Sequence, residues 1–219
     1  MFTRPRSKPR MTPDIDALAA QIRAQQTGDR RILVAIIGAP ASGKSHLSDR
    51  LYHHLGGDKA GAVVVPMDGF HFDDAILKDR GLLARKGAPD TFDVGGLKRV
   101  LLALRDQEDE DIYVPVFDRE LELSRGSARV ISQHHRIILV EGNYLLLDQA
   151  PWDQLGPLFD LSIYLDVAES TLRERLIGRW QGFGFDMDAA ITKAETNDLP
   201  NARTVITSSK AADITLTNG

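Results

Sequence analysis

The chain contains no cysteine among its 219 residues. Disulfide bonds, thiolate catalysis and cysteine-ligated zinc are therefore excluded, and the composition suits a cytoplasmic protein. Apolar runs are short, and none approaches the roughly 20 residues that a membrane-spanning helix needs. The formal net charge is −4, so overall charge gives no reason to expect nucleic acid as a partner. Hydrophobic residues make up 42% and charged residues 26%, as in an ordinary soluble globular protein.

The amino-terminal segment contains no apolar stretch of the kind found in a secretory signal. Residues 1–11 instead carry four basic side chains and two prolines. We interpret them as a disordered basic tail, with Met11 an equally good start. No linker or repeat divides the remainder, and residues 12–219 are expected to form one domain.

Hydrophobic periodicity predicts buried strands alternating with amphipathic helices. Such alternation is typical of an α/β fold with a mostly parallel sheet and helices on both faces. Expected strands cover residues 31–37, 62–66, 112–116, 136–140, 161–166 and 213–216, and expected helices cover 12–26, 44–55, 94–104, 168–180, 188–197 and 202–208.

The segment from Gly38 to Ser45 fits the phosphate-loop pattern G-x-x-x-x-G-K-[ST] between an expected strand and an expected helix. Loop amides and the helix amino terminus then face an anion. Lys44 is expected to reach the β- and γ-phosphates, and Ser45 to ligate Mg²⁺. We therefore expect the three-layer P-loop NTPase fold, with ATP and Mg²⁺ as cofactors. The expected nucleotide contacts in this loop are Gly38, Ala39, Pro40, Ala41, Ser42, Gly43, Lys44, Ser45 and His46.

Two carboxylates follow expected strands, and the carboxyl ends of parallel strands are where ligands bind. Asp68 follows strand 62–66, and Glu141 ends strand 136–140. Transfer of a phosphoryl group to a hydroxyl needs a base, so Asp68 is the candidate base and a candidate Mg²⁺ ligand. Glu141 is a candidate second metal ligand or a contact for a substrate hydroxyl. The alternative is that each residue merely caps its strand.

Further candidates lie in less regular segments. Arg175 and Arg179 are four residues apart on one face of an expected helix, followed by a glycine-rich stretch. A mobile lid that offers arginines to the transferred phosphoryl group would have this pattern, and so would a solvated basic face. His71 lies three residues after Asp68, where it could contact substrate or act locally in the structure.

Six further segments carry a family resemblance: Val65–Phe72, Arg80–Leu83, Arg85–Asp93, Pro115–Arg119, Val140–Leu146 and Asn197–Ala202. They resemble the superfamily of uridine kinase, pantothenate kinase and phosphoribulokinase, and the later ones are more similar to small bacterial kinases named for fructose or fructose transport. The resemblance implies that Asp68 is a catalytic base near Mg²⁺, that the helix with Arg175 and Arg179 is a lid, and that Asn201 lies near adenine. It also implies an acceptor pocket lined by Lys86, Phe117, Asp118 and Arg119.

The leading hypothesis is an ATP-dependent kinase of a small hydroxylated metabolite, with a sugar, fructose for preference, as acceptor. Pantothenate kinases have a histidine after Pro-Val-Tyr, whereas this chain has Asp118 and Arg119. A pantothenate- or nucleoside-type kinase stays open, as does a nucleotide-binding regulatory protein without turnover. The expected partner is a small-molecule acceptor, with neither nucleic acid nor membrane, and a homodimer is left open.

Overall fold

The computed structural model describes residues 14–106 and 111–218; the expected basic tail lies outside these ranges. A five-stranded parallel sheet with the strand order β2-β5-β1-β6-β7 forms its centre. This confirms the expected α/β class. Its strands are β1 (Ile32–Gly38), β2 (Ala62–Pro66), β5 (Ile137–Gly142), β6 (Leu161–Asp166) and β7 (Ile214–Thr217).

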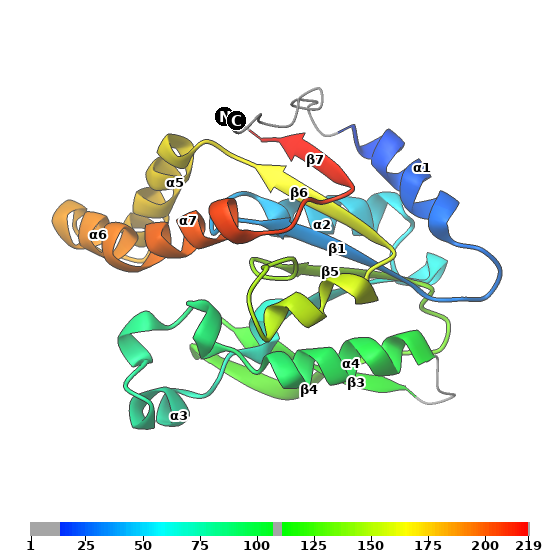
Figure 1. Ribbon diagram of the computed structural model, residues 1–219, viewed down its shortest axis with the longest axis horizontal. Coiled ribbons are helices and arrows are strands. Elements are labelled where there is room, and N and C mark those ends of the chain that lie inside the picture. The colour runs from blue at the N-terminus through cyan, green and yellow to red at the C-terminus, as the bar shows by residue number, and fades with distance from the viewer. Residues whose placement is uncertain (1–13, 107–110, 219) are drawn as a thin grey trace, which may run out of the picture.

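Helices cover both faces of the sheet (Figure 1), and for this reason β1 and β5 are buried along their whole length. One core cluster joins the sheet to α1 and α2. A second joins it to α4, α7 and the turns around Trp152, and a third joins α5 to α6 and α7. The helices are α1 (Ile15–Gln25), α2 (Lys44–His54), α3 (Asp74–Asp79), α4 (Val94–Asp106), α5 (Glu169–Gly182), α6 (Met187–Lys193) and α7 (Leu199–Ser208).

A separate two-stranded antiparallel sheet consists of β3 (Ile112–Asp118) and β4 (Leu123–Ile131). The sequence predicts only a short strand at 112–116 and no β4, because most side chains of β4 are exposed and carry no apolar alternation. The hairpin packs directly on the short helical turn after β2. A Cβ on Gly69 in that turn would lie 2.3 Å from the carbonyl oxygen of Pro115, so the contact requires glycine.

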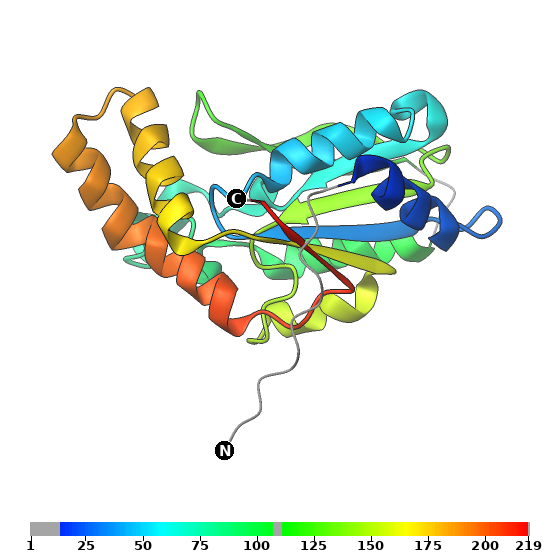
Figure 2. The same ribbon diagram turned by 90° about the horizontal axis from the view of Figure 1, so that it is seen from above.

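The helices after β6 form a nearly continuous unit. The sequence predicts separate helices at 188–197 and 202–208, whereas a π-helical turn (Ala194–Asp198) connects α6 to α7, which begins at Leu199. Pro200 lies in the first turn of α7, directly after the π-helical turn, where its missing N–H interrupts the hydrogen-bond ladder of a continuing α-helix. Seen from above, α5 and α6 form a helical pair projecting beyond the sheet (Figure 2). None of the helices in the described ranges has the length and hydropathy of a bilayer-spanning segment.

Candidate active site

The phosphate loop connects β1 to α2 in a conformation suited to binding an anion. Ala41 and Gly43 both have left-handed backbone angles, with φ of 64° and 94°. A Cβ on Gly38 would lie 2.4 Å from Ser42 Oγ, so the loop closes tightly only with glycine there. Consecutive residues in mixed-handed conformations turn their N–H groups inward to form an anion-binding nest, next to the amino terminus of α2.

Two side chains from distant parts of the chain hold this loop. Arg175 Nη1 of α5 donates to the carbonyl oxygen of Ala41 at 3.4 Å, so this expected lid arginine does reach the phosphate loop. Asn218 Nδ2 donates to the carbonyl oxygen of Ser42 at 2.7 Å. The sequence does not indicate this contact of Asn218, since no local pattern relates it to Ser42, 176 residues away.

The two expected carboxylates meet at the carboxyl end of the sheet. Glu141 pairs in register with Ile36 of β1 and Pro66 of β2. Ser45 Oγ donates to Glu141 Oε2 at 3.1 Å. Asp68 lies just beyond β2, and its Oδ2 accepts from Arg119 Nη2 at 2.6 Å.

The surroundings move the pKa values of the two carboxyls in opposite directions. Burial raises the pKa of Asp68, but nearby positive charges, Lys44 foremost, lower it below its ordinary value. Burial raises the pKa of Glu141 above its ordinary value, and Lys44 opposes the shift. Asp68 is therefore ionised at neutral pH, as a base must be. A cation bound at Glu141 would offset the burial that disfavours its charge.

This donor set fits a magnesium ion. The Ser45 hydroxyl and the two carboxylates offer only oxygen, which Mg²⁺ prefers. A cavity of about 440 Å³ opens beside Ser45 and Glu141, and it leaves room for the waters that Mg²⁺ usually keeps. Lys44 and the loop amides would hold the phosphates of a nucleotide.

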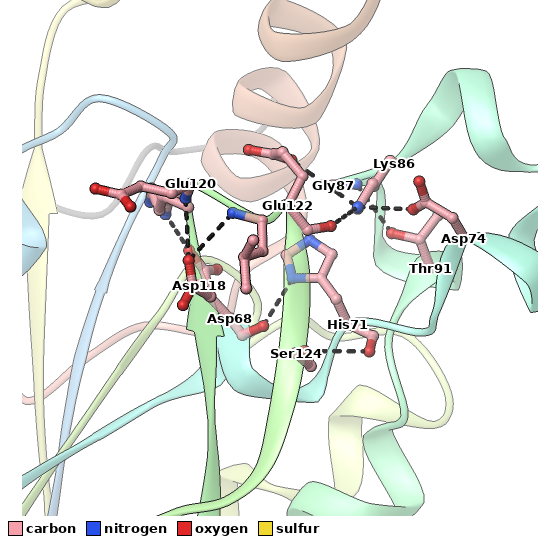
Figure 3. Close-up of polar contacts among 12 residues, drawn as sticks. Asp68, His71, Asp74, Lys86, Gly87, Thr91, Asp118, Glu120, Glu122 and Ser124 are labelled. Carbon is pink, nitrogen blue, oxygen red and sulfur yellow. Dashed lines mark hydrogen bonds and ion pairs between the residues drawn. The ribbon is translucent and has the colours of Figure 1, made fainter.

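Three of the expected acceptor residues, Asp68, His71 and Lys86, lie against the β3–β4 hairpin (Figure 3). Lys86 Nζ donates to Asp74 Oδ1 and to the carbonyl oxygen of Glu122, both at 2.7 Å. Its side chain is 18% exposed. Lys86 thus ties α3 to the hairpin turn, although the sequence predicts a substrate contact. The substrate role of Lys86 stays a prediction.

His71 donates one hydrogen bond through Nδ1 and leaves its other ring nitrogen, Nε2, as an acceptor. Its Nδ1 lies 2.8 Å from the carbonyl oxygen of Asp68, which can only accept, so Nδ1 carries a proton. The ring lies between Phe92 and Phe117, at centroid distances of 4.0 and 4.9 Å. Burial lowers the pKa of His71. In the resulting neutral ring, Nε2 is free to accept a hydrogen bond from a hydroxyl group.

Arg179, the second arginine of the expected lid helix, has a different partner from Arg175. Arg179 Nη2 donates to Asp198 Oδ1 at 3.2 Å, and Trp180 Nε1 donates to Asp198 Oδ2 at 2.6 Å. The Asp198 side chain, in the π-helical turn, is 10% exposed. Arg175 and Arg179 therefore share a helix but have separate partners in this conformation.

The acceptor segment, residues Arg85–Asp93, is hydrogen-bonded to the π-helical turn and to α7, which follow the expected lid helix α5. Arg85 donates to the carbonyl oxygen of Thr196 at 3.0 Å and to Asn201 Oδ1 at 3.4 Å. Asn197 Nδ2 donates to the carbonyl oxygen of Lys86 at 2.9 Å. Asn201, expected near adenine, is 3% exposed in this contact, and its nucleotide role stays a prediction.

A group of titratable side chains lies at the opposite, amino-terminal edge of the sheet. Asp58 Oδ1 lies 3.3 Å from His134 Nε2 and 2.9 Å from His135 Nε2, although the sequence spacing gives no indication of a metal site. The N–H of Ser132 donates to His135 Nδ1 at 2.9 Å. In the neutral ring the proton is then on Nε2, where it donates to Asp58. This tautomer favours a hydrogen-bonded cluster over a metal site.

The fold and the site together define a P-loop kinase that acts on a small molecule. The model of the phosphoribulokinase / uridine kinase family matches residues 33–218. The chain belongs to this family, which transfers a phosphoryl group from ATP to a hydroxyl acceptor.

Individual relatives agree with this class. A crystal structure named "putative fructose transport system kinase", from Silicibacter sp. TM1040, is 41% identical, with a TM-score of 0.87 over 93% of this chain and 98% of that one. A "putative uridine kinase" of Schizosaccharomyces pombe is 30% identical over 196 residues, covering 85% of this chain and 83% of the relative. YFH7 of Saccharomyces cerevisiae shares the fold at 19% identity, with a TM-score of 0.80 over 94% of this chain and 100% of that one.

Proposed function

We propose that this protein transfers the γ-phosphoryl group of Mg-ATP to a hydroxyl of a sugar, with fructose as the first candidate skeleton. The observation that carries the proposal is the position of Asp68, an ionised carboxylate beside Lys44 of a complete phosphate loop. The name of the Silicibacter relative, "putative fructose transport system kinase", supports the choice of fructose.

Each step can be assigned to side chains of this chain. The loop amides and Lys44 would hold the phosphates, while Ser45, Asp68 and Glu141 would hold Mg²⁺, which supplies charge neutralisation when bound. Asp68 would accept the proton of the attacking hydroxyl. Arg175, already in contact with the loop, would stabilise the negative charge on the transferred phosphoryl group.

His71 would orient the acceptor. In the neutral ring its Nε2 accepts a hydrogen bond, so it can bind a second hydroxyl of a polyhydroxylated acceptor next to the one that reacts. A pantothenate- or nucleoside-type acceptor is the alternative within this enzyme class. A regulatory protein that binds nucleotide without turnover is the alternative outside it.

Release of ADP from Mg-ATP, measured across a panel of sugars, pantothenate and nucleosides, tests the proposal. One strong acceptor is expected among the sugars. Asp68→Asn should then lower kcat by about 10²–10⁴-fold, the usual contribution of a general base, with ATP binding retained. Asp16→Asn, at an 85%-exposed side chain on α1, is the matched control and should leave kcat unchanged. Bound ATP with no turnover on any acceptor would favour the regulatory alternative.

A further inference from the structure

The proposed base is already occupied by a cation. Arg119 Nη2 lies 2.6 Å from Asp68 Oδ2, in an ion pair between a 62%-exposed and a 23%-exposed side chain. The only other side-chain contact described for Arg119 is with the ring of Phe117, 5.5 Å from the guanidinium carbon to the ring centroid. Arg119 therefore depends on the base itself for its ion pair.

The other cations around the hairpin have partners away from the base. Lys86 is held by Asp74 and by the backbone of Glu122. Arg125 pairs with Asp118 at 3.4 Å. Among the described side chains of the hairpin and the acceptor segment, Arg119 is thus the cation whose ion-pair partner is a group that the reaction must use.

Arg119 can move without disturbing the hairpin. Asp118 Oδ1 accepts the N–H groups of Glu120 and Leu121, both at 3.1 Å, and so fixes the turn backbone independently of the Arg119 side chain. The exposed guanidinium can then pivot over the face of Phe117. The backbone cost of releasing Asp68 is small.

The electrostatic cost of that release depends on the acceptor. A hydroxyl that approaches Asp68 competes with Arg119 for the same carboxylate, and displacement of Arg119 breaks a charge-assisted hydrogen bond. A neutral sugar offers the guanidinium no replacement charge. An acceptor with its own anionic group offers the guanidinium a replacement charge. A ligand shifts the equilibrium between paired and released Arg119 only by its differential affinity for the two states.

On this basis, which rests on the proposed kinase function, we propose that the acceptor is a sugar derivative with an anionic group, either a carboxylate or a phosphate ester, that takes Arg119 from Asp68. Arg119 would then determine specificity for the charge of the acceptor. Both anionic groups match the planar fork of a guanidinium.

Acceptor kinetics with fructose, a fructose phosphate and a hexonate test this proposal and separate the two sources of charge. One of the two acidic acceptors should have a kcat/KM at least about 10-fold above that of fructose. Arg119→Gln should lower the value for that acceptor by about 10-fold or more, the typical worth of a hydrogen bond to a charged group, and leave fructose much less affected. Arg119→Lys should retain part of the preference. Arg125→Gln, in the same hairpin, should behave as the wild type.

The proposal fails if fructose is the best acceptor, or if Arg119→Gln lowers kcat/KM equally for charged and neutral acceptors. Calorimetric titration of the same three compounds distinguishes this failure from failure of the kinase proposal. Without turnover on any acceptor, binding of an acidic sugar that Arg119→Gln abolishes would still support the anion contact. Equal binding to wild type and Arg119→Gln would overturn it.

Discussion

Gly69→Ala tests whether the hairpin must lie so close to the base. The added Cβ would be 2.3 Å from the carbonyl oxygen and 2.7 Å from the carbonyl carbon of Pro115. Both atoms belong to the backbone, so no side-chain rotation relieves the clash. Overpacking of this kind costs about 1–3 kcal/mol. For a chain of this size each kcal/mol lowers Tm by about 2–4 °C.

The same substitution should reduce activity, because Gly69 follows Asp68 directly. Displacement of a catalytic group by about 1 Å can cost about 10²-fold in rate. Urea unfolding and steady-state kinase kinetics would measure the two effects. Gly126→Ala is the matched control. Gly126 lies in β4 of the hairpin itself and has a non-positive φ, and a Cβ there would meet nothing within 4 Å. If both variants have the same stability and kcat, the packing argument is refuted.

Four further variants test other parts of the structure. Lys44→Ala should lower kcat by about 10²–10³-fold, the usual cost of losing one preorganised electrostatic contact, and near-normal turnover would contradict the phosphate site. Arg175→Ala should lower kcat more than Arg179→Ala, because Arg175 contacts the phosphate loop whereas Arg179 pairs with Asp198; the reverse order in kinase assays would show that the lid rearranges. Burial lowers the pKa of His135 in the folded protein. Below about pH 6.5 the imidazole therefore binds a proton more readily in the unfolded chain than in the folded one. The free energy of unfolding should thus fall between pH 7.5 and 5.5, and His135→Asn should lose less over this interval in urea titrations; identical losses would reject the assignment.

The sequence predicts the parallel sheet well because its strands are continuous apolar runs, such as Ile32–Gly38, which burial on both faces requires. It misses β4 because a strand with little buried surface has no hydrophobic period to detect. The π-helical turn is missed for a different reason. Its geometry depends on Asp198 binding Trp180 and Arg179, and these contacts exist only after α5 has packed against it.

The candidate site, too, has a part that the sequence predicts and a part that it does not. The phosphate loop is a local pattern, and Asp68 and Glu141 follow predicted strands, so the sequence places all three at one edge of the sheet. The supports of the site are not local: Asn218 and Arg85 contact residues more than a hundred positions away. The partners of Arg119 and Lys86 likewise depend on a hairpin whose second strand has no sequence signal.

The hydrogen bonds from Arg85 and Asn197 have a thermodynamic consequence, because they join the π-helical turn after the expected lid helix to the acceptor segment. If nucleotide binding moves the expected lid helix α5 together with the π-helical turn, it must also move the segment around Lys86 or break these bonds. The two substrates are then linked, and linkage is reciprocal: ATP must change acceptor affinity by the same factor by which the acceptor changes ATP affinity. The dissociation constant of each substrate would therefore depend on whether the other substrate is bound, and removal of both the Arg85 and the Asn197 side chains should weaken this dependence.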